Sequence, residues 1–121
     1  MGSYKDLDIY KLAFDLSSRI HRNSLKLPKY ELYEQGSQIR RSSKSVKDQI
    51  VEGYGRRRYK ADFIKFLVYA QASNDECLGQ IETIIEIYPE KEGWNELHAD
   101  CDILGKKINK FIQYVENNWK S

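Results

Sequence analysis

The 121-residue sequence has only two prolines, two cysteines and no long hydrophobic run. Because proline and glycine interrupt helices, so few prolines and only seven glycines leave room for long regular elements. Its apolar runs are far shorter than the roughly 20 residues that a membrane helix needs. The first residues also lack the basic and apolar regions of a signal peptide. We therefore expect a cytoplasmic protein without membrane contact, folded as a single domain over residues 1–121.

Motifs of catalysis and metal binding are also missing. Cys77 and Cys101 have neither CxxC spacing nor a histidine at ligand spacing, so we interpret them as buried thiols rather than zinc ligands. His21 and His98 stand alone, and His98 shares a helix face only with Asp102, which is typical of a solvated surface. No HExxH, P-loop or Ser–His–acid motif occurs. We expect no enzymatic activity, no cofactor and no metal site.

Apolar residues recur every three or four positions through most of the chain, which is typical of amphipathic helices. The clearest helix begins near Trp94, and its seam comprises Leu97, Cys101, Leu104, Ile108, Phe111, Val115 and Trp119. Three more helices are predicted over about residues 6–25, 29–53 and 61–88. Because short connections force consecutive helices to run antiparallel, the predicted fold class is all-α, an up-down-up-down antiparallel four-helix bundle.

The predicted seams differ in character. The first helix would bury Ile9, Leu12, Ala13, Leu16 and Ile20. The second has the small residues Gly36 and Ser43 on its seam, which allow a close helix approach, and Gly36 is a point at which this segment could divide. The third carries more apolar residues than one seam needs (Ile64, Val68 and Ile87), which predicts a second buried contact between subunits.

The net charge of +2 hides a strong asymmetry along the chain. Residues 40–60 carry +6, whereas residues 61–102 carry −8. Arg40, Lys44 and Lys47 are spaced so that they form one ridge on the predicted second helix. An arginine-rich turn follows, with Arg56 to Arg58 between Tyr54 and Tyr59. The candidate nucleic-acid-binding residues are all the basic residues of this segment: Arg40, Arg41, Lys44, Lys47, Arg56, Arg57, Arg58 and Lys60. Guanidinium groups suit phosphates and tyrosine rings suit bases, which favours RNA.

A second interpretation of the same charges stays open. The basic helix and the acidic helix that follows it would then pair within the chain or across a subunit interface, fixing orientation rather than binding a ligand. A further stripe beside the seam is interpreted as a hydrogen-bonded structural motif, with a ligand pocket as the alternative: Gln38, Arg41, Ser45 and Glu52, together with Gly53 and Gly55.

Several of these segments resemble the 23S rRNA intervening-sequence protein family. The similar stretches are PKYE at 28–31, QIRRSSKSV at 38–46, QIVEGYGR at 49–56 and FIKFLVYA at 63–70, and DLDIYKLA at 6–13 resembles the usual opening. Ser42 and Ser43 replace two alanines of the family pattern, and Gln49 replaces an asparagine. Lys44 and Lys47 stand at apolar or proline positions, so this version of the helix is more basic.

The resemblance implies a small four-helix bundle that forms a homo-oligomer, commonly a pentamer, without enzymatic activity. It also implies an association with RNA, since some members are encoded inside segments removed from 23S rRNA. The accessory proteins of diversity-generating retroelements are distantly similar. The hypothesis from the sequence is thus an oligomeric bundle that binds RNA or DNA through its basic segment. The alternative is a scaffold for a protein partner.

Overall fold

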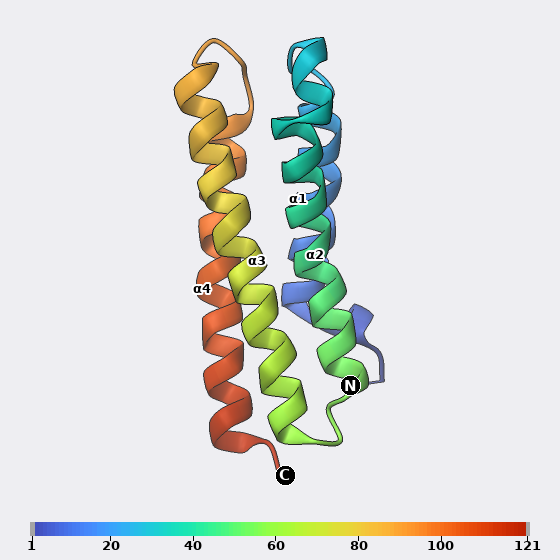
Figure 1. The fold of residues 1–121 in the computed structure, drawn as a ribbon. Helices are drawn as coiled ribbons and strands as arrows, with labels where there is room; N and C mark the ends of the chain where they lie inside the picture. The colour runs from blue at the N-terminus through green and yellow to red at the C-terminus, as the bar shows by residue number, and fades with distance from the viewer. Residues whose placement is uncertain (1, 121) are drawn as a thin grey trace.

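The computed structural model describes residues 2–120 and contains four long helices packed as a bundle (Figure 1). The helices are α1 (Asp8–Ser24), α2 (Gln35–Gly55), α3 (Lys60–Ile87) and α4 (Trp94–Asn118), with short 3-10 helices η1 (Tyr4–Asp6) and η2 (Lys29–Tyr33). Successive helices run in opposite directions, so that both ends of the chain and the α2–α3 turn lie at the same end of the bundle (Figure 1). The predicted all-α four-helix bundle is confirmed.

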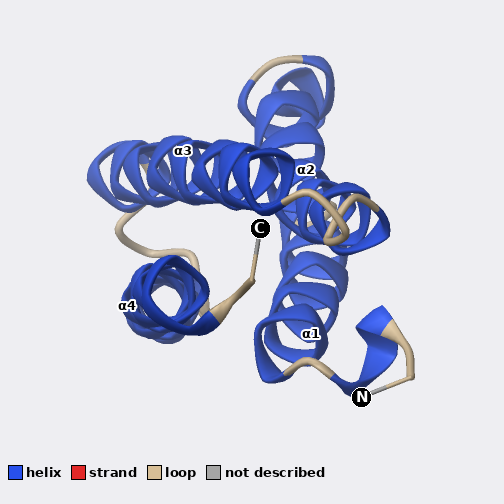
Figure 2. Ribbon diagram, turned by 90° about the horizontal axis from the view of Figure 1, so that it is seen from below, coloured by secondary structure: helices blue, strands red, loops and turns tan. Residues whose placement is uncertain are grey.

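Each long helix packs against two others, α1 on α2, α2 on α3, α3 on α4 and α4 on α1. Seen from below, α1 and α2 form one side of the bundle, and α3 and α4 form the other (Figure 2). Within residues 2–120, no helix is both long enough and apolar enough to cross a membrane.

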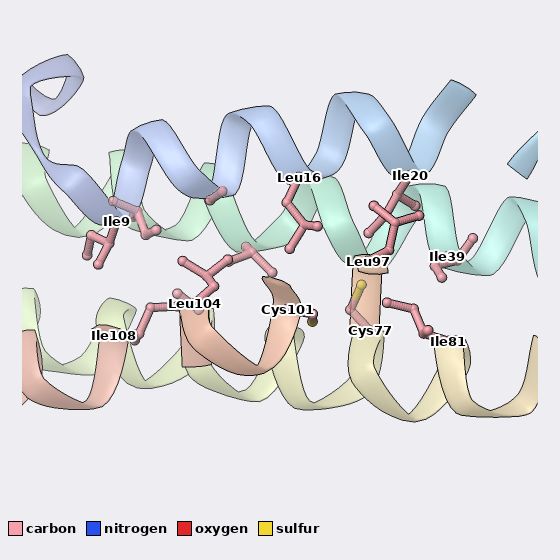
Figure 3. Packing of buried hydrophobic residues seen from close by; sticks show 14 of the residues in the cluster. Ile9, Leu16, Ile20, Ile39, Cys77, Ile81, Leu97, Cys101, Leu104 and Ile108 are labelled. Carbon is pink, nitrogen blue, oxygen red and sulfur yellow. The ribbon is translucent and has the colours of Figure 1, made fainter. Parts of the chain in front are cut away.

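The core lies along the predicted seams. Ile9, Leu16, Ile20 and their counterparts on the other three helices point into the space between the helices (Figure 3). Both cysteines are buried free thiols, as predicted. Leu12 is an exception, because 37% of it is exposed. It lies about 100° around the helix from Ala13, outside the narrow face of α1 that the neighbouring helices cover.

The segment expected as one helix over residues 29–53 is divided. The break falls at Glu34 (φ −116°, ψ −103°), so that η2 ends just before α2 begins. Gly36 permits this arrangement, because a Cβ at that position would lie 2.8 Å from the backbone oxygen of Glu31. The small residue therefore makes room for η2 rather than for a long partner helix.

One buried polar residue was missed from the sequence. Asn74 is 2% exposed and lies between the apolar seam positions of α3. Its amide donates a hydrogen bond of 3.0 Å to the backbone oxygen of Cys101 on α4, which satisfies the amide and ties the two helices together. Of the three additional apolar residues of α3, Ile64 is partly buried and packs against the core, whereas Val68 (47%) and Ile87 (52%) are exposed. A subunit contact through them stays a prediction.

Two helical glycines give a prediction about stability. A Cβ added at Gly79, on the exposed side of α3, meets nothing within 4 Å, so Gly79→Ala should stabilise the protein by about 0.5–1 kcal/mol. At Gly53 the same Cβ would lie 3.1 Å from Cβ of Phe66 and 3.3 Å from the backbone oxygen of Phe63. That oxygen belongs to the backbone of α3 and cannot move aside as a flexible side chain can. Gly53→Ala should therefore not give the stabilisation expected at Gly79, and it should destabilise the fold. Urea denaturation of both variants is the measurement; equal stabilisation would contradict the close α2–α3 packing.

Candidate nucleic-acid interface

Arg40 begins the basic ridge of α2 and also braces the connection from α1. Its guanidinium donates hydrogen bonds to the backbone oxygen of Leu32 (2.6 Å) and to the hydroxyl of Ser24 (3.0 Å). These acceptors are neutral, so the side chain is held in place while its positive charge is not neutralised by a carboxylate. Arg40 therefore contributes charge to the ridge from a fixed, half-buried position.

One turn further along α2, Lys44 lies against α1. Its ammonium is 3.1 Å from Nδ1 of His21, and Arg22 is the next residue of α1. Burial and then the positive charges of Lys44, Arg40 and Arg22 lower the pKa of His21 below its usual 6.5. We call these four residues, His21, Arg22, Arg40 and Lys44, the upper basic cluster.

The lower part of the ridge borders a cleft. Lys47 forms an ion pair of 2.8 Å with Asp48, and both line a cleft of about 570 Å³ between the N-terminal segment and α2. Tyr4 and Tyr10 line the same cleft, with their rings edge to face at a centroid distance of 4.9 Å. Aromatic rings beside cations are the elements with which proteins bind unpaired nucleotides.

The arginine-rich turn joins α2 to α3 at the other end of the ridge. The guanidinium of Arg57 lies 4.0 Å from the centre of the Tyr54 ring and donates a hydrogen bond to the Tyr54 backbone oxygen. The backbone oxygen of Arg57 accepts a hydrogen bond of 2.8 Å from the Trp119 indole. These contacts tie the turn to the end of α4. Arg58 projects near Tyr59, 5.8 Å from its ring centre, and both side chains are exposed.

Arg56 leaves the same turn toward α3. It forms ion pairs with Glu52 (3.3 Å) and Asp62 (3.8 Å), and its guanidinium lies 4.9 Å from the ring centre of Phe66. Lys65 also approaches this ring and that of Tyr69, which is 44% exposed. The surface next to the turn thus alternates cations and aromatic rings.

The remaining two candidates have different surroundings. Lys60, at the start of α3, donates a hydrogen bond of 2.6 Å to the backbone oxygen of Glu116. Arg41 is exposed and bonds only weakly, at 3.3 Å, to the hydroxyl of Ser37 one turn earlier. The eight candidates therefore form no single compact patch. They follow α2 along its length and continue around its C-terminal end.

The charges of α2 and α3 pair little within the chain. In residues 2–120, a single ion pair joins the basic segment 40–60 to the acidic segment 61–102, namely Arg56 with Asp62 at 3.8 Å between two partly exposed side chains. Such a pair contributes little to stability. Within residues 2–120, the acidic residues of α3 therefore leave most of the charge of the basic segment unpaired. Pairing of these charges across a subunit interface stays a prediction.

Comparison with known protein families found a match over most of this chain. The family model described as 23S rRNA-intervening sequence protein matches residues 5–110, which is most of the sequence. The chain belongs to the 23S rRNA-intervening sequence protein family. No curated protein matches it significantly. The matched region includes all of α1, α2 and α3, and with them every candidate residue of the basic ridge and turn.

Within this family member, the stripe beside the α2 seam does not form the expected interhelical network. Gln38 is exposed, Arg41 bonds within α2, and Glu52 pairs with Arg56 at the end of the same helix. In the described part of the chain, Ser45 alone crosses to another helix, with 2.9 Å between its hydroxyl and that of Ser73. The stripe faces solvent because it lies beside the buried seam rather than on it.

Of the two glycines of this motif, Gly53 is buried against α3 and Gly55 faces open space. Gly53 is therefore the one that the helix packing requires. Sequence reasoning also missed several residues near the basic ridge: Tyr4, Tyr10, His21, Arg22, Lys65 and Tyr69. Spacing along one helix gives no signal for most of them, because they come from other helices that the fold brings alongside α2.

Proposed function

We propose that this chain is a non-enzymatic helical bundle that binds nucleic acid, with RNA as the preferred class, through the α2 ridge and the arginine-rich turn. The chain belongs to a family whose name refers to an intervening sequence of 23S rRNA, and this supports an association with RNA. The observation that carries the proposal is that, among residues 2–120, only Lys47 and Arg56 of the eight candidate cations form ion pairs with carboxylates. The others have positive charge to offer to phosphates.

The chemistry around these cations favours single-stranded or irregular RNA. Tyr59 is 59% exposed next to Arg58, and Tyr4 and Tyr10 line the cleft beside Lys47. Exposed rings next to cations stack on unpaired bases, whereas a paired duplex keeps its bases inside.

We also propose that the bundle acts as a homo-oligomer, a pentamer by resemblance to its family. The exposed apolar side chains of α3, Val68 and Ile87 among them, support a subunit contact. Several copies of one modest basic surface in a ring would raise the effective affinity for a long nucleic acid without any new contact. Light scattering after gel filtration measures the number of subunits directly.

The test of the proposed function is fluorescence anisotropy with labelled single-stranded RNA, single-stranded DNA and duplex DNA over a range of salt concentrations. We expect binding that is tightest for single-stranded RNA and that falls steeply as salt rises, because the release of counterions from the nucleic acid favours binding less at high salt. Absence of binding to all three probes at low salt would contradict the proposal. It would favour the alternative function, a protein-interaction scaffold whose basic and acidic faces pair within the oligomer.

A further inference from the structure

The upper basic cluster contains a histidine in an unusual position. Its Nδ1 atom is 3.1 Å from the Lys44 ammonium, on the side of α1 that faces α2. An ammonium group has only hydrogens to offer, so it is the donor in this contact, and Nδ1 must carry a lone pair. His21 is therefore neutral in this arrangement, with its proton on Nε2.

No carboxylate accounts for the gathering of these charges. Burial, Lys44 and Arg40 on α2, and Arg22 on α1 itself all lower the pKa of His21, and no acidic group opposes them. On the helices that contact α1, Asp100 of α4 pairs with Arg19 and Asp48 of α2 pairs with Lys47. The Glu31 carboxylate of η2, which contacts α2, accepts a hydrogen bond from Tyr88. The carboxylate of η1, Asp6, lies at the opposite end of α1.

The backbone near the cluster does not supply the missing negative charge either. A helix C-terminus exposes carbonyl oxygens that attract cations. In α1 these oxygens are already occupied, since the carbonyl of His21 accepts from the Ser24 hydroxyl and that of Arg22 accepts from the Leu25 amide. The carbonyls of Asn23 and Ser24 accept from the amides of Lys26 and Leu27. The cluster thus holds cations together without a matching anion in the described fold.

We infer that His21, Lys44 and Arg22 hold one phosphodiester group of a bound nucleic acid, and that His21 takes up a proton when they do so. This inference rests on the proposed function and assigns part of the same surface. A phosphate oxygen entering between the two side chains accepts from Lys44, which releases Nδ1 of His21. Nδ1 then binds a proton from solvent and donates to the phosphate, while Arg40 remains on Ser24 and Leu32 and adds its charge.

The linkage between binding and pH follows from the two pKa values of His21. In the free protein this pKa lies below 6.5, and the phosphate raises it in the complex. Well above the bound-state pKa neither form is protonated, and affinity does not depend on pH. As pH falls through the bound-state pKa affinity rises, and it levels off below the free-state pKa. A difference of one unit between the two values corresponds to about tenfold in affinity.

Anisotropy with a labelled oligouridylate, measured at constant ionic strength from about pH 8 to about pH 5.5, tests this linkage. Uracil and phosphodiester groups do not titrate in that range. We expect about tenfold tighter binding at the acidic end for the unaltered protein and no pH dependence for His21→Gln. The matched control is His98→Gln, because His98 pairs with Glu82 on the other side of the bundle and this variant should keep the full pH dependence.

The outcomes separate the two proposals. Binding that is salt-sensitive but independent of pH in the unaltered protein, or equal pH dependence in His21→Gln, would overturn the role of His21 and leave the proposed function standing. Absence of oligouridylate binding at every pH would remove both. A second measurement requires no variant: proton NMR of the His21 ring should show its pKa rising when the oligouridylate is added, and an unchanged pKa in the saturated complex would also overturn the inference.

Discussion

Replacing Arg41, Lys44 and Arg58 together with glutamate is expected to weaken binding of single-stranded RNA by about 100-fold at moderate salt. All three side chains are exposed, and none of them forms an ion pair in residues 2–120. With each phosphate contact that is lost, fewer counterions are released on binding. The slope of log affinity against log salt should therefore become shallower by about 0.7 per contact for a single strand. Anisotropy at several salt concentrations measures both effects.

A matched control exists on α4. Lys106, Lys107 and Lys110 are also exposed, and replacing them with glutamate changes the net charge by the same amount. Unlike the first set, this one includes an ion-paired residue, since Lys106 lies 3.1 Å from Asp102 one turn earlier. If binding depends on the α2 surface, this control should weaken it far less than the first triple variant. Equal losses in the two variants would mean that only the overall charge matters, and circular dichroism and gel filtration should show the bundle and its oligomeric size intact in both. A loss of the oligomer in the α2 variant would instead support pairing of these charges across a subunit interface.

Phe63→Ala is expected to destabilise the protein by about 3–5 kcal/mol, as is usual when a fully buried large ring is removed. Phe63 has no exposed surface, and its ring makes edge-to-face contacts with Tyr54, Phe111 and Trp119 at centroid distances of 6.3, 5.9 and 5.2 Å. The cavity would open where α2, α3 and α4 meet below the arginine-rich turn. Because a domain of this size has a total stability of about 5–15 kcal/mol, thermal unfolding should move to a clearly lower temperature.

Phe14→Ala is the control for this change. Phe14 is a phenylalanine on α1 that is 51% exposed and has a tilted contact with Tyr10 at 6.0 Å. Its removal should cost less than about 1 kcal/mol, because little buried surface is lost. Similar destabilisation by both substitutions would contradict the central position of Phe63. Urea denaturation followed by circular dichroism distinguishes the two results.

The arginine-rich turn should respond to the same substitution. Trp119 packs on Phe63 and donates its indole hydrogen to the backbone oxygen of Arg57, so the core ring indirectly fixes the turn. The run of arginines at the end of α2 can be read from the local sequence. The conformation of the turn that carries them depends on Trp119, which is 62 positions away from Arg57.

Much of the fold follows from local patterns. The spacing of Leu97, Cys101, Leu104 and Ile108 predicted α4 because one apolar face repeats every 3.6 residues, whatever the neighbouring helices are. The short connections predicted antiparallel neighbours, because a short loop cannot reach the far end of the preceding helix. The division of the second segment was predicted less well, because the break at Glu34 depends on η2 folding back onto Gly36.

The candidate site was predicted in part. The positions of Lys44 and Arg58 in a basic segment can be read from the sequence, and both are exposed. That Arg40 is held by Ser24 and Leu32, or that Tyr10 lines a cleft with Lys47, could not be read, since these partners come from other elements. The expected network of Gln38, Arg41, Ser45 and Glu52 failed for the same reason, because spacing gives the face of a helix but not what lies opposite it.

The sequence by itself determined the helices, their antiparallel order and the concentration of positive charge on α2, because helical periodicity and charge are properties of neighbouring residues. Only the tertiary structure decided which of those charges are paired, which are braced and which face solvent. It also brought His21 of α1 to within 3.1 Å of Lys44 of α2. The physical reason is that a hydrogen bond or ion pair depends on distances of a few ångströms between side chains, and only the packing of the helices sets those distances.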